Sequence, residues 1–124
     1  MIPAFLASAR DGHPATVHGD GEQTRDFTYV SDIVAATRAA ADSARSGGVY
    51  NVGGGERVSI NGILERIRSI TGRPLTVLRE EAQKGDMRDT FADTGAARRE
   101  LGFRSTVGLD EGLAREWEWL RRLA

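Results

Sequence analysis

Residues 19–34 read GDGEQTRDFTYVSDIV, and this stretch decides how the rest of the chain is interpreted. Its glycines favour a tight turn, because glycine adopts positive φ without steric cost. Beyond the turn, Phe27 and Tyr29 alternate with polar residues, which predicts a strand over residues 25–30. Asp32, or the serine before it, is then expected to cap a helix. The stretch therefore predicts a turn, a strand and a helix in close succession.

Patterns on both sides of this stretch predict further helices and strands. Apolar residues at helical spacing predict helices near residues 2–10, 33–44, 60–70, 95–101 and 109–120. Short runs of β-branched and other apolar residues predict strands near residues 15–18, 49–52 and 75–78. A long polar stretch without periodicity predicts a loop at residues 80–89. The fold class is therefore expected to be a small mixed α/β domain.

The length and composition of the chain fit one globular domain. The 124 residues carry a net charge of −1, which argues against a general affinity for nucleic acid. No apolar run is long enough to span a membrane, so we expect a cytoplasmic protein without a membrane partner. The chain has no cysteine and only two histidines, which argues against a metal site.

A run of three glycines at residues 53–55 follows a predicted strand and raises the question of a phosphate-binding turn. A dinucleotide-binding fingerprint opens a helix directly and ends on a further, spaced glycine. Here the helix begins only near Ser59, and Val58 stands where the last glycine is needed. These spacings favour an ordinary turn over a cofactor site.

Residues 19–34 are one of several segments that resemble a known family. The others are YNVGGG at residues 50–55, LGF at residues 101–103, LDEGL at residues 109–113 and EWEW at residues 116–119. Together they resemble the extended short-chain dehydrogenase/reductases that act as NAD-dependent epimerases and dehydratases, in particular the UDP-glucose 4-epimerase-like members. The resemblance implies that residues 1–124 form a single carboxyl-terminal nucleotide-sugar-binding domain, an apparent truncation that lacks the Rossmann domain.

The resemblance also implies which chemistry the chain lacks. Members of this family use a catalytic tyrosine whose pKa is lowered by a lysine four positions later. Here Tyr29 and Tyr50 are followed at that spacing by Ile33 and Gly54, and Lys84 is the only lysine. NAD is implied for the full-length family, whereas this chain is expected to hold no cofactor and no catalytic residue of its own. We therefore expect it to be inactive alone.

By the same resemblance, Arg25 binds the diphosphate of a nucleotide sugar. Arginine suits this role because its planar guanidinium contacts phosphate oxygens in a bidentate manner. The residues themselves leave a second role open, in which Arg25 pairs with Asp20 or Asp26 at the surface. The two roles differ in whether the guanidinium faces a ligand pocket or solvent.

The loop QKGDMRDT at residues 83–90 resembles a second ligand-binding segment of the family. In that segment an arginine two residues before the glycine contacts phosphate, and an aspartate contacts the ribose hydroxyls. Asp86 fits the aspartate, whereas Gln83 stands at the arginine position, which leaves Lys84 or Arg88 to supply the charge. A salt bridge of Asp86 or Arg88 in a solvent-facing loop is the open alternative.

The resemblance also places the strand before the glycine turn beside the nucleobase, which implies that Thr16 and His18 line the base site. His18 stands where an aromatic side chain is usual, so it either stacks on the base or is a plain surface histidine. The expected ligand is a UDP-sugar or a related nucleotide sugar. The residues do not select among the possible bases and sugars.

The expected partner is a second copy of the chain or the missing cofactor domain. In relatives, the helix after Asp32 and the strand at Tyr50 pack against the cofactor domain, so we expect exposed apolar surface and a homodimer here. Trp119 points away from the apolar stripe of the last helix, so it either faces a partner or the missing domain or is a lone exposed tryptophan. The alternative hypothesis is a non-enzymatic, self-associating binding or assembly module that keeps the fold without the chemistry.

Overall fold

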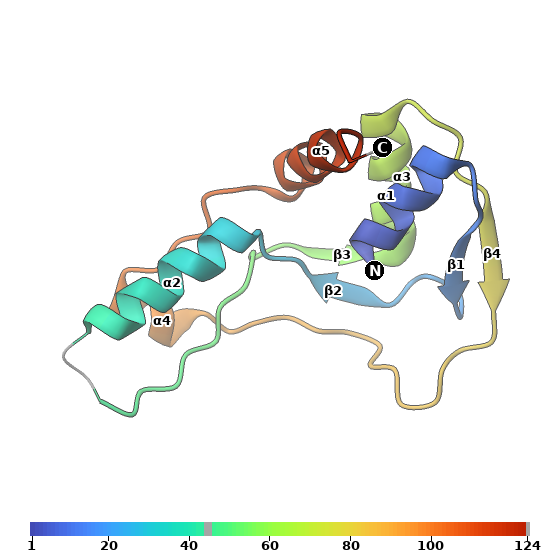
Figure 1. The fold of residues 1–124 in the computed structure, drawn as a ribbon. Helices are drawn as coiled ribbons and strands as arrows, with labels where there is room; N and C mark the ends of the chain where they lie inside the picture. The colour runs from blue at the N-terminus through green and yellow to red at the C-terminus, as the bar shows by residue number, and fades with distance from the viewer. Residues whose placement is uncertain (44–45, 124) are drawn as a thin grey trace.

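The structure, a computed structural model, describes residues 1–43 and 46–123. Figure 1 shows a compact part, here called the body, from which a second part, here called the arm, projects. The body consists of α1 (Ile2–Asp11), β1 (Ala15–His18), β2 (Thr24–Asp26), β3 (Arg57–Ser59), α3 (Ile60–Thr71), β4 (Val77–Glu80) and α5 (Leu109–Leu120). The arm consists of α2 (Val30–Asp42), the loop at residues 46–56 and α4 (Gly95–Leu101). Within the two described ranges, no helix is both long and apolar enough to cross a membrane.

The central helix of the body is α3, and local sequence signals set both of its ends. The Ser59 side chain caps the helix by accepting a hydrogen bond from the Gly62 backbone N–H at 3.1 Å. Gly72 ends the helix in the left-handed conformation, with φ 63°. The predicted apolar stripe is confirmed by four buried side chains, those of Ile60, Ile63, Leu64 and Ile67.

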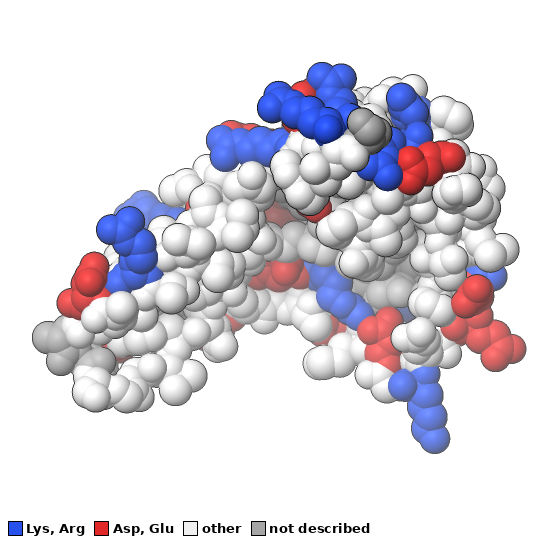
Figure 2. All heavy atoms as spheres, in the orientation of Figure 1, with Lys and Arg blue, Asp and Glu red and all other residues white. Residues whose placement is uncertain are grey.

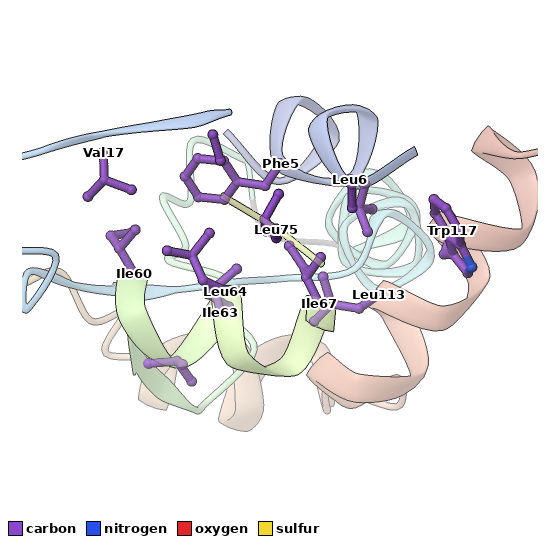
Figure 3. Packing of buried hydrophobic residues seen from close by; sticks show 13 residues of the cluster. Phe5, Leu6, Val17, Ile60, Ile63, Leu64, Ile67, Leu75, Leu113 and Trp117 are labelled. Atoms are coloured by element: carbon purple, nitrogen blue, oxygen red, sulfur yellow. The ribbon is translucent and has the colours of Figure 1, made fainter. Parts of the chain in front are cut away.

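The core of the body lies where α3 meets α1 and α5. Figure 3 shows Leu6, Ile67 and Leu113 lying close together, one from each of these three helices. Each of these side chains is at most 2% exposed. Full burial of an aliphatic side chain of this size stabilises the fold by about 1.5–3 kcal/mol. The predicted helices at both ends of the chain are thus confirmed and supply most of the core with α3.

Two small sheets lie beside these helices in the body. β1 and β4 are parallel, with His18 opposite Glu80 at the end of the pair. β2 and β3 are antiparallel, with Arg25 opposite Val58. The Thr24 position also forms an isolated bridge to Asp89, which draws the long loop after β4 toward β2. The expected mixed α/β class is therefore confirmed.

The arm is held together by a much smaller apolar cluster. Ala36 of α2 and Ala97 of α4 are buried together with Phe103, and Tyr50 and Val52 pack against them. The small side chains allow α2 and α4 to approach closely, as the alanines of the predicted helix indicated. The arm therefore has few apolar contacts to stabilise two helices and a loop.

The predicted capping role of Asp32 is wrong. α2 begins at Val30 after Tyr29, which makes no side-chain capping bond, so Asp32 lies inside the first turn. Its carboxylate is 2% exposed and accepts four hydrogen bonds from the segment that leads into α5. The donors are Ser105 Oγ at 2.9 Å, Thr106 N at 3.0 Å, Thr106 Oγ1 at 2.6 Å and Val107 N at 3.3 Å. Asp32 therefore fastens the arm to the body instead of capping a helix.

The protonation of Asp32 reflects two opposing effects. Burial alone raises the pKa of this carboxyl, because it disfavours the charged form. The hydrogen bonds from Thr106, Ser105 and Val107 favour the charged form, and together they leave the pKa below its ordinary value. The carboxylate is consequently ionised at neutral pH.

The predicted strand over residues 25–30 is shorter than expected. β3 pairs only with Thr24–Asp26, so the extended backbone beyond Asp26 has no ladder to join before α2 begins. β3 itself was not expected from the sequence, because three residues carry too little pattern to predict a strand. The strand expected over residues 75–78 lies at Val77–Glu80, where it pairs with β1.

Residues 49–52 form no strand, contrary to the prediction. Within the described chain no segment pairs with them, and Val49 is 91% exposed. A strand needs a neighbour to satisfy its backbone groups, so an apolar β-branched pattern alone does not produce one. Ala44, which the predicted stripe of α2 included, lies outside the described residues.

Candidate functional site

The candidate site is a pocket of about 320 Å³ on the body. It lies between the amino-terminal end of α1, the strands β1 and β2, and the loop after β4. Figure 2 shows a hollow below α1 in which basic and acidic side chains lie near each other. The lining residues are Met1, Ala4, Phe5, Thr16, Val17, His18, Gln23, Arg25, Ile60, Gln83 and Asp86. The pocket thus has an apolar wall from α1 and a charged wall from β2 and the loop.

The charged wall is built around Arg25. Its Nη2 donates to Asp86 Oδ1 at 2.5 Å, and its Nη1 donates to the Thr24 carbonyl at 2.7 Å. The Arg25 side chain is 22% exposed, so most of it is shielded while its end faces the pocket. The predicted surface pairing of Arg25 with Asp20 or Asp26 does not occur. The structure instead joins two predicted site residues, Arg25 and Asp86, that are 61 positions apart.

The loop that carries Asp86 is anchored close to β2. Thr24 N donates to the Arg88 carbonyl at 2.9 Å, and Thr90 N donates to the Thr24 carbonyl at 3.2 Å. Asp86 itself closes a turn, because its N–H donates to the Gln83 carbonyl at 3.2 Å. The turn contains a glycine in the left-handed region, which allows the sharp reversal. The backbone of the loop therefore places the carboxylate at the pocket.

His18 forms the polar end of the same pocket. Its Nε2 lies 3.2 Å from the Gln83 amide nitrogen, and its Nδ1 lies 3.6 Å from Glu80 Oε2. The ring is 36% exposed, so one part of it remains open to the pocket. Thr16, two residues earlier on β1, is exposed and points to the same side of the strand. Four of the five predicted ligand residues thus share one pocket.

Arg88 is the exception among the predicted ligand residues. Its Nη1 donates to both carboxylate oxygens of Asp20, at 2.9 and 3.0 Å, and its side chain is 62% exposed. The pKa of Asp20 lies below its ordinary value, because the Glu22 backbone N–H and Arg88 both favour its charged form. Arg88 lines an adjoining pocket of about 230 Å³, which shares His18 and Asp86 with the first. It therefore stands next to the main pocket, in the salt bridge that the sequence left open.

Two further contributors were missed in the sequence. Gln23 lines the pocket and donates its amide to the His18 carbonyl at 2.9 Å, which ties β2 to the end of β1. Phe5 closes the apolar wall from α1 and is only 6% exposed. Gln23 lies directly before β2 and two residues before Arg25, so the two-residue alternation of extended backbone was the available signal. Nothing in the pattern of α1 distinguished Phe5 from an ordinary core residue.

The glycine run at residues 53–55 has a structural role in this chain. A Cβ on Gly54 would lie 1.9 Å from the Phe27 carbonyl oxygen, so the two backbones are in direct contact. The Gly55 N–H donates to Asp26 Oδ1 at 3.1 Å. At Gly53 and Gly54 the chain's own atoms lie where a diphosphate would have to approach, so this part of the run does not fit as a cradle for the diphosphate of NAD.

Both tyrosines of the chain make structural contacts. The Arg115 guanidinium lies 5.5 Å from the centre of the Tyr29 ring, and that ring approaches Gly112 so closely that a Cβ there would lie 3.0 Å away. The Tyr50 hydroxyl donates to Glu100 Oε2 at 2.9 Å. Each ring therefore holds parts of the fold together.

The fold and the site define a small mixed α/β unit with a charged pocket on one side. Residues 1–53 match the model of the NAD dependent epimerase/dehydratase family. The chain is therefore similar to members of this family, and the model matches less than half of its residues. The match agrees with the resemblance carried by residues 19–34, which lie within the matched range.

Relatives with known names extend the match over the rest of the chain. An uncharacterized UDP-glucose epimerase of Bacillus subtilis is 35% identical over 111 residues, which cover 89% of this chain and 35% of that protein. The crystal structure of a Bacillus cereus UDP-glucuronic acid 4-epimerase with UDP-glucuronic acid and NAD is 33% identical, with a TM-score of 0.94. This match covers all of the present chain and 40% of the other.

A third relative has the same partial coverage. The Thermotoga maritima UDP-glucose 4-epimerase, in a structure with UDP-glucose, is 30% identical with a TM-score of 0.93. The match covers 98% of this chain and 39% of that one. The chain thus spans about two fifths of the length of these relatives.

Proposed function

We propose that this chain is the nucleotide-sugar-binding part of an NAD-dependent epimerase or dehydratase, with a UDP-sugar as the preferred ligand class. The known relatives include enzymes of UDP-glucose and UDP-glucuronic acid, and two of the cited structures contain such ligands. The proposal further holds that the chain works in the cytoplasm and does not catalyse a reaction by itself. The tyrosine and lysine of the family's catalytic pair, and the cofactor contacts, would have to come from outside these residues.

One observation carries the proposal. Arg25 and Asp86 meet in a single pocket although they lie on different elements. A nucleoside diphosphate needs a cation for its phosphates and an acceptor for its vicinal ribose hydroxyls, and these two side chains have that chemistry. The pocket is also large enough to hold part of such a ligand, at about 320 Å³.

The remaining lining residues fit the other end of the ligand. We propose that Thr16 and His18 border the base, with the His18 ring offering either a stacking face or a hydrogen bond. The proposed role of Arg88 is to add positive charge at the mouth, from the adjoining pocket. Lys84 lies on the same loop and supplies a further cation near the phosphates. In this arrangement Gln83 supports His18 instead of contacting phosphate.

Titration calorimetry with UDP and UDP-glucose tests the proposal. We expect the purified chain to bind UDP saturably and the Arg25→Ala variant to lose at least about tenfold in affinity, because a charged hydrogen bond contributes about 1.5–3 kcal/mol. Arg121→Ala is the matched control, since Arg121 is an exposed arginine paired with Glu118 on α5. That control should bind UDP like the parent chain.

Two results would contradict the proposed ligand. The absence of UDP binding by the parent chain would remove the function altogether. Equal losses in Arg25→Ala and Arg121→Ala would mean that the nucleotide responds only to the overall charge of the protein. Saturable binding that only Arg25→Ala weakens is the expected result.

A second candidate function is self-association without chemistry, and the surface of α2 favours it. Val30, Ile33 and Val34 are 65%, 41% and 52% exposed on this helix. Trp119 on α5 is 58% exposed, as expected from its position off the apolar stripe. Exposed apolar side chains grouped on one helix are typical of a surface that another protein covers. We propose a homodimer or a docked cofactor domain as the occupant, and sedimentation distinguishes the two.

A further inference from the structure

We propose that Asp86 makes the pocket selective for nucleoside diphosphates over simple inorganic anions. This inference rests on the proposed function and concerns the same site. Asp86 Oδ1 accepts a hydrogen bond from Arg25 Nη2 at 2.5 Å. The carboxylate therefore holds the position on Arg25 that a phosphate oxygen would need.

A simple anion gains little by entering such a site. To reach Arg25 it has to displace Asp86, which breaks a charge-assisted hydrogen bond and leaves two negative groups side by side. Arg88, the other arginine of this loop, is already paired with both oxygens of Asp20, so it does not take over the displaced carboxylate. Binding of inorganic phosphate or pyrophosphate is thus opposed by the protein's own carboxylate.

A nucleotide changes this balance because it carries its own hydroxyl groups. Its diphosphate takes the guanidinium of Arg25, while its two vicinal ribose hydroxyls give Asp86 new donors in place of the lost one. The exchange keeps both side chains hydrogen-bonded. Asp86 thus opposes the binding of every anion to Arg25. Only a ligand that carries vicinal hydroxyls next to its anionic group replaces the hydrogen bond that Asp86 loses.

The loop geometry permits the exchange without rebuilding the body. The Asp86 side chain is 39% exposed, and the turn that carries it contains Gly85 with φ 92°. Beyond the turn, the loop is fixed to β2 by backbone hydrogen bonds on both sides of Thr24 and by the Thr24 hydroxyl, which donates to Asp89. The carboxylate can therefore shift by rotation of its side chain while the end of the loop stays in place.

The test compares UDP and sodium pyrophosphate by calorimetry on three proteins. They are the parent chain, Asp86→Asn, and Asp11→Asn as the control. Asp11 pairs with Arg10 on α1, away from the pocket. The side chains of Arg10 and Asp11 are 24% and 39% exposed, nearly the same as the 22% and 39% of Arg25 and Asp86. Both variants lose the same charge, so a difference between them reports the site itself.

We expect Asp86→Asn to bind pyrophosphate about fivefold more tightly than the parent chain, the scale of an exposed ion pair. Its affinity for UDP should not rise, so that its preference for UDP over pyrophosphate falls by at least about fivefold. Asp11→Asn should match the parent chain for both ligands. Melting curves followed by circular dichroism establish that each variant is folded.

The possible failures are distinguishable. If the parent chain binds UDP but Asp86→Asn leaves pyrophosphate affinity unchanged, the selectivity role is overturned while the proposed function stands. If Asp86→Asn strengthens the binding of UDP and of pyrophosphate equally, Asp86 competes with both ligands without selectivity. That result also overturns the selectivity role. If the parent chain does not bind UDP, both proposals fall together.

Discussion

The body and the arm of this chain are stabilised in different ways. The body has a continuous core in which Leu6, Ile63 and Ile67 are fully buried. The buried cluster of the arm centres on Ala36, Ala97 and Phe103. Hydrophobic stabilisation grows with the apolar area removed from water, so the body can stand alone far better than the arm can. The difference separates the body, which holds the candidate pocket, from an arm that exposes apolar side chains.

Polar contacts compensate for the small apolar cluster of the arm. The buried Asp32 carboxylate joins α2 to the segment before α5. Asp26 joins the end of β2 to the glycine loop through Gly55 N and to the later chain through Ala92 N. These bonds fix where the arm lies but bury little apolar area. The apolar side of α2 remains exposed, and Figure 2 shows much of the arm without charge.

The largest expected effect comes from opening the core of the body. Ile63→Ala should lower the free energy of unfolding by about 3–4 kcal/mol, because it leaves a cavity at a site with no exposed surface. Ile33→Ala, on the exposed side of the arm, should change it by no more than about 0.5 kcal/mol. Urea denaturation of the two variants measures both. Equal effects would contradict the division into body and arm.

Removing the buried carboxylate of the arm should have a smaller and more local effect. Asp32→Asn turns an amide toward donors that need an acceptor, at a cost of about 2–3 kcal/mol. Hydrogen exchange should accelerate at α2 and α4 and stay slow at α3. Asp42→Asn is the control, since this aspartate lies exposed on the same helix. Faster exchange across the body would refute a role confined to the arm.

Acid should act on the same contact. The pKa of Asp32 in the folded chain lies below its ordinary value of 3.8, so its stabilising contribution is complete above that value. The contribution is lost as the pH falls through the lowered pKa of the folded state. Exchange at α2, corrected for the intrinsic exchange rate at each pH, should therefore rise in the parent chain as the pH falls below the ordinary value of 3.8. Asp32→Asn should lack this rise, and the same rise in the variant would disprove the assignment.

Self-association is expected to show the smallest change in free energy. Val34→Glu on α2 should weaken a dimer by at least about tenfold in Kd, because it places a charge on the exposed apolar face. Sedimentation equilibrium measures the shift. Leu123→Glu is the control, as Leu123 is a similarly exposed residue near the end of the chain. A parent chain that stays monomeric would leave the docked cofactor domain as the proposed occupant.

The elements that could be predicted from the sequence are those whose signals are local. α3 has its serine cap, its apolar spacing and its terminal glycine within one segment, so its prediction is confirmed in full. The prediction missed β3 and wrongly placed a strand at residues 49–52. A strand depends on a pairing neighbour, which the local sequence pattern does not identify. Asp32 failed for a related reason, since its position before apolar residues matches a cap while its true partners lie about 74 residues later.

The candidate site was only partly accessible from the sequence. Arg25 and Asp86 were found through the family resemblance, because no spacing rule connects residues so far apart. Their direct pairing is a property of the fold, produced by the contact between Thr24 and the loop after β4. Phe5 was not found, since a buried aromatic residue on a helix looks the same whether or not a pocket lies beside it.

The most direct test of this account is an NMR titration of the labelled chain with UDP. Backbone amide signals of β1, β2 and the loop at residues 81–89 should shift, with the largest changes around Arg25 and Asp86. Signals of α2 and α4 should stay in place, because the arm does not line the pocket. Shifts centred on the arm, or the absence of any shift at saturating UDP, would contradict the claim that the body is a nucleotide-binding unit.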